Sequence, residues 1–362
     1  MNEVPWISIE GLKIPLHEIP REIPDNIKPN GTKALMFCKE WLEGKEAFTI
    51  TTSGSTGAPK KVTVRRQSML ASAQRTAEAL KLRPGMTALV CLDTGFIAGM
   101  MMLVRGLATG MNMIVTEPSA NPLRNLASAK IDFTALVPYQ MNAILNSDQR
   151  EQLALIGTII LGGAAINADL HRAINNIPAA CYATFGMTET LSHIALQRLN
   201  GVQRQENFHV LKGILISADE RGCLVINADY LDKPIVTNDL VEIIRPGEFK
   251  WIGRWDNLIN TGGIKVVPEK IEKIVAEWML QKSLSNRFFV TGRAHQELGQ
   301  QVVLAIEGKI SQEQKEDMMQ ALAQAVTRYE LPKDVVFVDQ FKETATGKID
   351  RSASLHPDAM DL

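Results

Sequence analysis

The sequence has few cysteines, and none of them stands in a metal-binding or disulfide-forming arrangement. Its 362 residues include four cysteines, Cys38, Cys91, Cys181 and Cys223, with no Cys-x-x-Cys pair. This spacing argues against a zinc site and against a disulfide framework. Buried free thiols in a reducing compartment fit better, so we expect a cytoplasmic protein.

The sequence also lacks an excess of charge, a secretory leader and a membrane segment. The 39 Lys+Arg nearly balance the 40 Asp+Glu, which does not favour a broad nucleic-acid-binding surface. The first residues have neither a basic region nor the apolar core of a signal peptide. The most apolar stretch, residues 86–115, is interrupted by Asp93, Arg105 and several glycines, which indicates buried core. We therefore expect small-molecule partners, no nucleic acid and no membrane span; a homo-oligomer stays an alternative to a monomer.

Short apolar runs alternate with helical patterns between about residues 46 and 200. A helical face is expected from Met69 to Leu80, and residues 1–45, which contain five prolines, are expected to be an irregular or extended lead-in. Strands alternating with helices predict a layered α/β domain. The strand-like runs are residues 47–52, 61–65, 88–92, 111–116, 133–137, 158–161 and 180–184.

The pattern changes near residue 250 and predicts a second, small α+β domain. Apolar positions from Ile271 to Met279 recur with helical spacing. Ser311 and Gln314 form a capping box for another helix, whose apolar face would comprise Met318, Leu322, Val326 and Tyr329. Strands are expected at residues 287–291, 301–306 and 334–338. With a length that suggests two domains, we expect boundaries at 1–253 and 254–362.

Residues 51–61, Thr-Thr-Ser-Gly-Ser-Thr-Gly-Ala-Pro-Lys-Lys, predict a polyphosphate-binding loop. Glycines permit positive φ and close approach of the backbone to an anion, and successive N–H groups can form an anion-binding nest. Hydroxyls and a lysine add donors and charge. The Walker A pattern does not fit, and by composition a plain surface loop is the alternative. The candidate phosphate-binding residues are Thr52, Ser53, Gly54, Ser55, Thr56, Gly57 and Lys60.

Two further motifs follow predicted strands. Gly162-Gly163-Ala164-Ala165 follows residues 158–161, where glycines allow a flat ring to pack on the backbone; a β-turn is the alternative. Phe185-Gly186-Met187-Thr188-Glu189-Thr190 follows residues 180–184. Glu189 could hold Mg²⁺, which usually takes only one or two protein carboxylates. The alternative is that Thr188 and Glu189 cap a helix.

Two more motifs lie in the second half of the chain. Thr237-Asn238-Asp239 precedes an apolar run, and an aspartate there can accept the hydroxyls of a ribose; a solvated turn is the alternative. Near the C-terminus, Thr346-Gly347 would form a turn that presents Lys348, whereas a frayed charged tail is the default interpretation.

Together these motifs resemble the adenylate-forming superfamily of acyl- and aryl-CoA synthetases, peptide-synthetase adenylation domains and luciferases. The order matches: Thr-Ser-Gly-Ser-Thr-Gly-x-Pro-Lys, Gly-Met-Thr-Glu, Thr-x-Asp, Gly-Arg-x-Asp and Thr-Gly-Lys. The resemblance implies a large layered N-terminal α/β domain, here shortened at its N-terminus, and a small mobile α+β C-terminal domain that pivots at Asp256. It departs from the family at Lys61, where a glycine is usual, at Phe185, commonly Tyr, and at Gly95, where many relatives have His.

The resemblance also implies ATP and coenzyme A as co-substrates, Mg²⁺ as the metal ion, and a role for each motif. Lys348, Glu189 and Thr188 would be catalytic, with Mg²⁺ on Glu189. Beyond the phosphate loop, ATP or AMP would contact Gly163, Ala164, Phe185, Gly186, Met187, Asp239 and Arg254. Gly262, Gly263 and Lys265 would face coenzyme A.

Within the superfamily the chain is most similar to o-succinylbenzoate–CoA ligases of menaquinone synthesis, in a compact form. The segments that carry this likeness are residues 95–99, 117–122 and 189–195, with Arg105. This substrate has two carboxylates, and the unreactive one needs a counter-charge in an apolar pocket. Arg105 has the planar fork for it, although a snorkelling arginine is the alternative. Phe96, Gly99, Ser192 and His193 would line the same pocket, although a core histidine with satisfied hydrogen bonds is the alternative for His193.

The implied reaction is ATP-dependent adenylation of a carboxylate with pyrophosphate release, followed by transfer of the acyl group to coenzyme A. Lys348 would bridge the carboxylate and the α-phosphate. Another aryl- or acyl-CoA ligase, or a stand-alone adenylating enzyme, is the alternative within the same chemistry. An ATP-binding protein without turnover is the alternative outside it.

Overall fold

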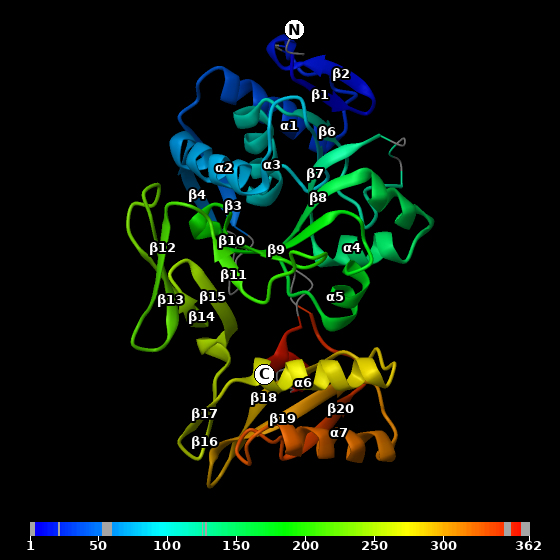
Figure 1. Ribbon diagram of the computed structural model, residues 1–362, viewed down its shortest axis with the longest axis vertical. Coiled ribbons are helices and arrows are strands. Elements are labelled where there is room, and N and C mark those ends of the chain that lie inside the picture. The colour runs from blue at the N-terminus through cyan, green and yellow to red at the C-terminus, as the bar shows by residue number, and fades with distance from the viewer. Residues whose placement is uncertain are drawn as a thin grey trace. The chain divides into compact units, whose positions relative to one another are not determined.

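The computed structural model describes residues 4–20, 22–52, 60–124, 126, 129–343 and 349–355 (Figure 1). Contacts between Cα atoms divide the chain into two compact units. Unit 1 comprises Met1–Ile216, Ile226–Ile235 and Ile244–Phe249, and unit 2 comprises Ser217–Val225, Val236–Ile243 and Lys250–Leu362. The first unit is therefore large and the second small.

The helices of unit 1 are α1 (Pro29–Leu42), α2 (Arg66–Leu80), α3 (Ile97–Thr109), α4 (Pro138–Leu145) and α5 (Ala168–Ile174). Its strands, together with those that run into unit 2, are β1 (Trp6–Ile9), β2 (Leu12–Pro15), β3 (Ala47–Thr52), β4 (Lys60–Arg65), β5 (Thr87–Val90), β6 (Asn112–Val115), β7 (Ile131–Leu136), β8 (Ile156–Leu161), β9 (Ala180–Gly186), β10 (His193–Arg198), β11 (Phe208–Val210), β12 (Ile214–Ala218), β13 (Cys223–Ala228), β14 (Ile235–Arg245) and β15 (Glu248–Arg254).

A long mixed sheet organises these strands, in the order β12-β13-β14-β15-β11-β10-β9-β8-β7-β5-β6-β1-β2 among the described residues. Its middle is parallel: β8 pairs with β7 and β9, and β5 pairs with β6 and β7. Crossover helices cover a parallel sheet and direct the following loops to its carboxyl edge. The predicted α/β class is confirmed, and each strand predicted between residues 46 and 200 is present with boundaries shifted by a few residues.

The core of this unit lies between the parallel strands and their helices. Leu89, Ile159 and Cys181 from strands pack with Met141 and Ile174 from helices, and each is fully buried. All four cysteines are free and buried, as expected from the sequence. Burial raises the pKa of Cys38, and likewise that of Cys91, to about 12, so these thiols are unreactive at neutral pH.

The prediction of an irregular or extended lead-in over residues 1–45 holds for the strands β1 and β2 and is wrong for residues 29–42, which form helix α1. β1 pairs with β2 and, in parallel, with β6, and α1 spans 14 residues. Pro29 occupies the first turn of α1, where a missing N–H costs nothing. Ala34, Leu35, Cys38 and Trp41 then form its buried face. The prolines start this helix instead of preventing it.

Unit 2 contains a five-stranded sheet of β16 (Ile259–Thr261), β17 (Ile264–Val266), β18 (Phe288–His295), β19 (Gly299–Glu307) and β20 (Asp334–Val338). Helices α6 (Pro268–Gln281), yellow in Figure 1, and α7 (Gln312–Ala325), orange, pack on one another and share a core with it. A short α8 (Arg351–Leu355) follows.

The predicted capping box at the start of α7 is confirmed, because Gln314 N donates to Ser311 Oγ at 3.1 Å and Ser311 N donates to Gln314 Oε1 at 2.8 Å. The prediction that Val326 and Tyr329 continue this helix is wrong. Val326 is extended, with φ −126°, and a separate turn follows, in which Thr327 N donates to Glu330 Oε2 at 2.9 Å. Within the described ranges, no helix is both long and apolar enough to cross a membrane.

Candidate functional site

An antiparallel hairpin carries the two ends of the proposed phosphate loop. β3 and β4 pair in register, with Thr52 opposite Lys60, and the inward faces of the hairpin bury Phe48, Ile50 and Val64. Residues 53–59, which connect the strands, lie outside the described residues. Phosphate binding by Ser53, Gly54, Ser55, Thr56 and Gly57 therefore stays a prediction, with its two ends held at paired positions.

The glycines after β8 and at the end of β9 stand where a side chain would not fit or would be strained. A Cβ at Gly162 would lie 2.4 Å from Thr184 Oγ1, and Gly163 has φ +83°. A Cβ at Gly186 would lie 2.4 Å from both Ser192 O and His193 Cα. Because β8 and β9 are parallel neighbours, both motifs lie at the same edge of the sheet, with Gly163 and Ala164 exposed there.

The Thr188–Glu189 segment forms the short 3-10 helix η3 (Thr188–Thr190). Its first turn is closed by Thr190, whose Oγ1 accepts a hydrogen bond from Met187 N at 3.0 Å, so the capping role belongs to Thr190. Glu189 is exposed. Across the described ranges, no cluster of three or more His, Cys, Asp or Glu could hold a metal ion. A lone accessible carboxylate fits Mg²⁺ that is held mainly by phosphates and water.

Arg105 is the largest fully buried side chain among the described residues, at 2% exposure. It lies on α3, and its Nη2 donates to Ser192 Oγ at 2.5 Å. Its Nε is buried without a hydrogen-bond partner, and the described residues place no carboxylate within ion-pair distance. Burial lowers the pKa of Arg105 to about 10, which leaves it charged at neutral pH. The snorkelling alternative is therefore wrong.

His193 and Thr76 extend this contact into a chain of hydrogen bonds. His193 Nδ1 lies 3.4 Å from Ser192 Oγ, and its Nε2 lies 3.1 Å from Thr76 Oγ1. Thr76 in turn donates to Ser72 O at 3.3 Å, so the arrangement favours a neutral ring with its proton on Nε2. Ser192 then donates to Nδ1 and accepts from Arg105. Sequence reasoning missed Thr76; a hydroxyl on the buried face of a predicted helix was the available signal.

The charge state of His193 follows from its surroundings. Burial, and then the nearby Arg105 charge, lower the pKa of His193 well below its usual 6.5. The imidazole is therefore neutral at physiological pH, and the charge of this cluster comes from Arg105 alone. A buried cation whose neighbours are a hydroxyl and a neutral ring is suited to an incoming carboxylate.

Phe96 and Gly99 lie where α3 begins. Phe96 precedes the first turn, and its side chain is half exposed, at 46%. A Cβ at Gly99 would lie 2.3 Å from Asp93 O, so only glycine allows the helix to pack this closely on the preceding turn. Gly99 thus has a packing role, and contact of either residue with an acyl group stays a prediction.

Unit 2 brings Asp239, Arg254 and Asp256 together. Asp239 lies inside β14 and is buried, so the interpretation of a solvated turn is wrong. Its Oδ1 accepts from Trp251 Nε1 at 3.0 Å, and its Oδ2 lies 3.7 Å from Arg254 Nη1. Arg254 also donates to Asp256 Oδ2 at 2.7 Å. The weakly engaged Oδ2 keeps acceptor capacity, which suits ribose hydroxyls.

The remaining predicted residues also lie in unit 2. Asp256 is in the short 3-10 helix η4 (Trp255–Asn257), and Asn238 Nδ2 donates to its Oδ1 at 2.9 Å. Gly262 and Gly263 adopt φ +58° and +82° in the turn between β16 and β17, and Lys265 Nζ lies 4.2 Å from the Trp255 ring centroid. Lys348 lies outside the described residues, and a β-bridge joins Glu343 with Ile349 on either side of it.

The sequence is similar to those of known enzymes. The family model described as AMP-binding enzyme matches residues 21–214. A 2-succinylbenzoate–CoA ligase from Lactococcus lactis is 24% identical over 329 residues, which cover 86% of this chain and 71% of the relative.

Solved structures are similar as well. An acyl-CoA synthetase (AMP-forming)/AMP-acid ligase II-like protein from Dyadobacter fermentans is 42% identical, with a TM-score of 0.63 over 93% of this chain and 96% of its own. An o-succinylbenzoate coenzyme A synthetase from Bacillus subtilis, in complex with ATP and magnesium ion, is 18% identical. Its TM-score of 0.69, over 85% of this chain and 69% of its own, supports the fold.

Proposed function

Because the chain belongs to the family of AMP-binding enzymes, we propose that it adenylates o-succinylbenzoate and transfers the acyl group to coenzyme A in menaquinone biosynthesis. The protein is an AMP-forming acid–CoA ligase that uses ATP, Mg²⁺ and coenzyme A.

The buried guanidinium of Arg105 carries the choice of acid. Among the described residues, the only oxygen that it contacts is the neutral Ser192 hydroxyl, and its Nε has no hydrogen-bond partner. The guanidinium, on an otherwise apolar helix, can therefore donate to one more acceptor. An unpaired buried charge is costly, and a carboxylate at this point offsets that cost. The reacting carboxylate must lie at the phosphates, so a carboxylate on Arg105 has to be a second one. An aromatic dicarboxylic acid such as o-succinylbenzoate meets this requirement.

In the first half-reaction, an oxygen of the reacting carboxylate attacks the α-phosphorus of ATP, and pyrophosphate leaves. The loop from Thr52 to Lys60 holds the β- and γ-phosphates, and the exposed backbone at Gly163 and Ala164 lies against the adenine. Asp239, with Arg254 beside it, accepts the ribose hydroxyls. Lys348 bridges the attacking carboxylate and the α-phosphate, where a positioned cation stabilises the developing charge.

Glu189 would hold Mg²⁺, because a lone accessible carboxylate fits an ion whose other ligands are phosphate oxygens and water. An ion bound there would neutralise charge on the phosphate oxygens. Thr188 precedes Glu189 on the same short 3-10 helix. In this proposal its hydroxyl acts beside the Glu189 carboxylate.

In the second half-reaction, the thiol of coenzyme A attacks the acyl carbonyl and AMP leaves. Lys348 has to withdraw for the thiol to enter, and rotation about Asp256 achieves this in the proposal. Gly262, Gly263 and Lys265 then face the coenzyme A side. Domain rotation of this kind commonly limits turnover.

The test is ATP–pyrophosphate exchange with matched acids. o-Succinylbenzoate is compared with 4-phenyl-4-oxobutanoate, which keeps the reacting chain and lacks the ring carboxylate. We expect strong exchange with the first acid only, and thioester formation when coenzyme A is added. Equal exchange with both acids would refute the role of Arg105; exchange without thioester would indicate a stand-alone adenylating enzyme; ATP binding without exchange would refute turnover.

A further inference from the structure

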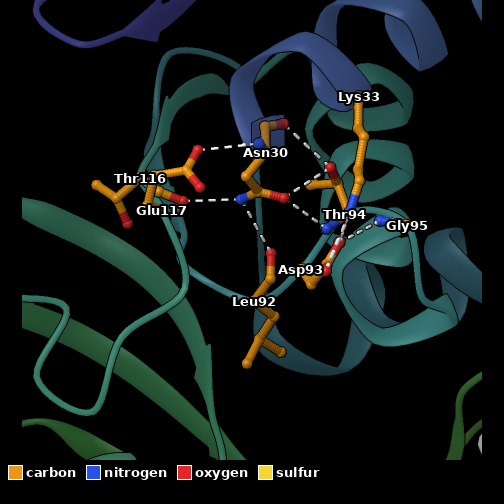
Figure 2. Close-up of polar contacts among 8 residues, drawn as sticks. All are labelled: Asn30, Lys33, Leu92, Asp93, Thr94, Gly95, Thr116 and Glu117. Atoms are coloured by element: carbon orange, nitrogen blue, oxygen red, sulfur yellow. Dashed lines mark hydrogen bonds and ion pairs between the residues drawn. The ribbon is translucent and has the colours of Figure 1, made fainter. Parts of the chain in front are cut away.

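Asn30 is a buried amide that the chemistry described so far does not use. It occupies the second position of α1 and is 2% exposed. Its Nδ2 donates to Thr116 O at 2.7 Å and to Leu92 O at 3.3 Å, and its Oδ1 accepts from Thr94 N at 2.8 Å. Figure 2 shows these bonds converging on one side chain from the segments that follow β5 and β6. Both N–H groups and the oxygen of the amide are therefore committed.

Two further contacts from α1 strengthen the same junction. Asn30 N donates to Glu117 Oε1 at 2.9 Å, which places a carboxylate at the positive end of α1. One turn later, Lys33 Nζ lies 2.9 Å from Asp93 Oδ1 (Figure 2). The same oxygen also accepts a hydrogen bond from Gly95 N at 2.8 Å. Through Asn30 and Lys33, helix α1 thus holds the turn Asp93–Gly95.

This turn is the start of α3. Phe96 N donates to Asp93 O at 3.1 Å. Gly99 packs closely on the same oxygen, because a Cβ at this position would lie 2.3 Å from it. The first turn of α3 therefore has no room to move independently of Asp93–Gly95. Because an α-helix transmits a displacement of its end along its length, the position of Arg105 on α3 depends on this junction.

We propose that Asn30 is a positioning residue for acid binding: its amide fixes the turn Asp93–Gly95, and through α3 it sets where Phe96 and Arg105 meet the substrate. The amide is required specifically, because two carbonyls face Nδ2 while an N–H faces Oδ1. An aspartate of the same shape would oppose the carbonyls of Leu92 and Thr116 with an oxygen. The inference rests on the proposed function for the substrate, and on geometry alone for the junction.

The test compares Asn30→Asp with Asn200→Asp. Asn200 is an equally buried amide of the same unit, at 2% exposure, whose Nδ2 donates to Ile177 O and Ala179 O, each at 2.9 Å. Its hydrogen bonds lie away from α1 and from the turn before α3, so it controls for general loss of stability. Thr94→Val, which removes only the hydroxyl that bonds Asn30 Oδ1 at 2.9 Å, serves if Asn30→Asp does not fold.

Two measurements decide the proposal. In pyrophosphate exchange below the unfolding temperature of each variant, we expect Asn30→Asp to raise the KM for the acid on the order of ten- to a hundredfold. The KM for ATP should stay within about twofold, with Asn200→Asp unchanged in both. In hydrogen exchange, peptides over residues 92–106 should lose protection in Asn30→Asp and keep it in Asn200→Asp.

The opposite results overturn the proposal. Unchanged acid KM in a folded Asn30 or Thr94 variant, or equal rises in the KM for acid and ATP, would show that the amide only holds the fold. Hydrogen exchange needs no substrate. If the wild type turns over no dicarboxylic acid, the proposed function fails, while protection of residues 92–106 still decides whether Asn30 fixes this junction.

Discussion

Replacing Arg105 by methionine tests whether the buried charge of Arg105 binds a ligand or stabilises the fold. The lowering of the Arg105 pKa from 12.5 to about 10 corresponds to roughly 3 kcal/mol by which burial opposes the charged form. Methionine has no charge to desolvate. It removes the hydrogen bond to Ser192, which contributes about 1.5 kcal/mol. We therefore expect the free energy of unfolding of Arg105→Met to equal that of the wild type or exceed it by about 1–2 kcal/mol.

The same substitution should damage acid binding. Removal of a charge-assisted bidentate hydrogen bond from a buried site costs about 3 kcal/mol, so the KM for the dicarboxylic acid should rise about a hundredfold. At about 100 times its Kd the acid should stabilise the wild type by roughly 2.7 kcal/mol, and at the same concentration this stabilisation should fall to about 0.4 kcal/mol in Arg105→Met. Urea unfolding with and without the acid, together with pyrophosphate exchange, measures both effects.

Arg198 provides the matched control. Its Nε donates to Asn200 O at 2.9 Å and its Nη1 to Tyr182 Oη at 3.0 Å, so these donors are satisfied within the fold. Arg198→Met should lower stability and leave the acid KM unchanged. The reasoning is refuted if Arg105→Met unfolds several kcal/mol more easily than the wild type while its KM for the acid stays normal.

Lys348, Thr76 and His193 each provide a further test. Lys348→Ala should reduce pyrophosphate exchange by more than about 10³-fold, because the lysine both orients the reactants and stabilises charge; near-normal exchange would disprove its catalytic role. Thr76→Val should raise the acid KM several-fold by freeing the Nε2 proton of His193, and Thr76→Ser should restore it. Thr134→Val, at an equally buried hydroxyl that donates to Leu89 O at 3.0 Å, should not change this KM, and a matching rise there would contradict the relay. The third test concerns pH. The folded-state pKa of His193 lies well below 6.5 because of burial and Arg105, so below about pH 6.5 the unfolded chain binds more protons. Stability should then fall with falling pH, by up to about 1.4 kcal/mol per pH unit from this group. His171, whose pKa is also lowered by burial, adds in the same direction. His193→Gln should have a shallower slope in urea unfolding between about pH 5 and 7, and an unchanged slope would show that His193 titrates normally.

The sequence predicted the strands and their edge from local patterns. Short apolar runs followed by glycine correspond to β8 and β9. The glycines are required there because a Cβ at Gly162 or Gly186 would clash with neighbouring backbone or hydroxyl atoms. The motif order also predicted the family, which the comparisons confirm. The prediction for residues 29–42 was wrong, because proline was taken to break helices although Pro29 lies in the first turn of α1, where proline is tolerated.

The amino-acid sequence by itself determined which chemical groups are present and in what order, because strand periodicity, caps and glycine requirements are local properties. It also singled out Arg105 as a charge within an apolar stretch. Only the tertiary structure decided that Arg105 meets a neutral hydroxyl at Ser192, that Thr76 orients His193 across 117 residues, and that Asn30 ties α1 to the turn before α3. Contacts between distant segments depend on how strands pair and helices pack, and no local pattern encodes them.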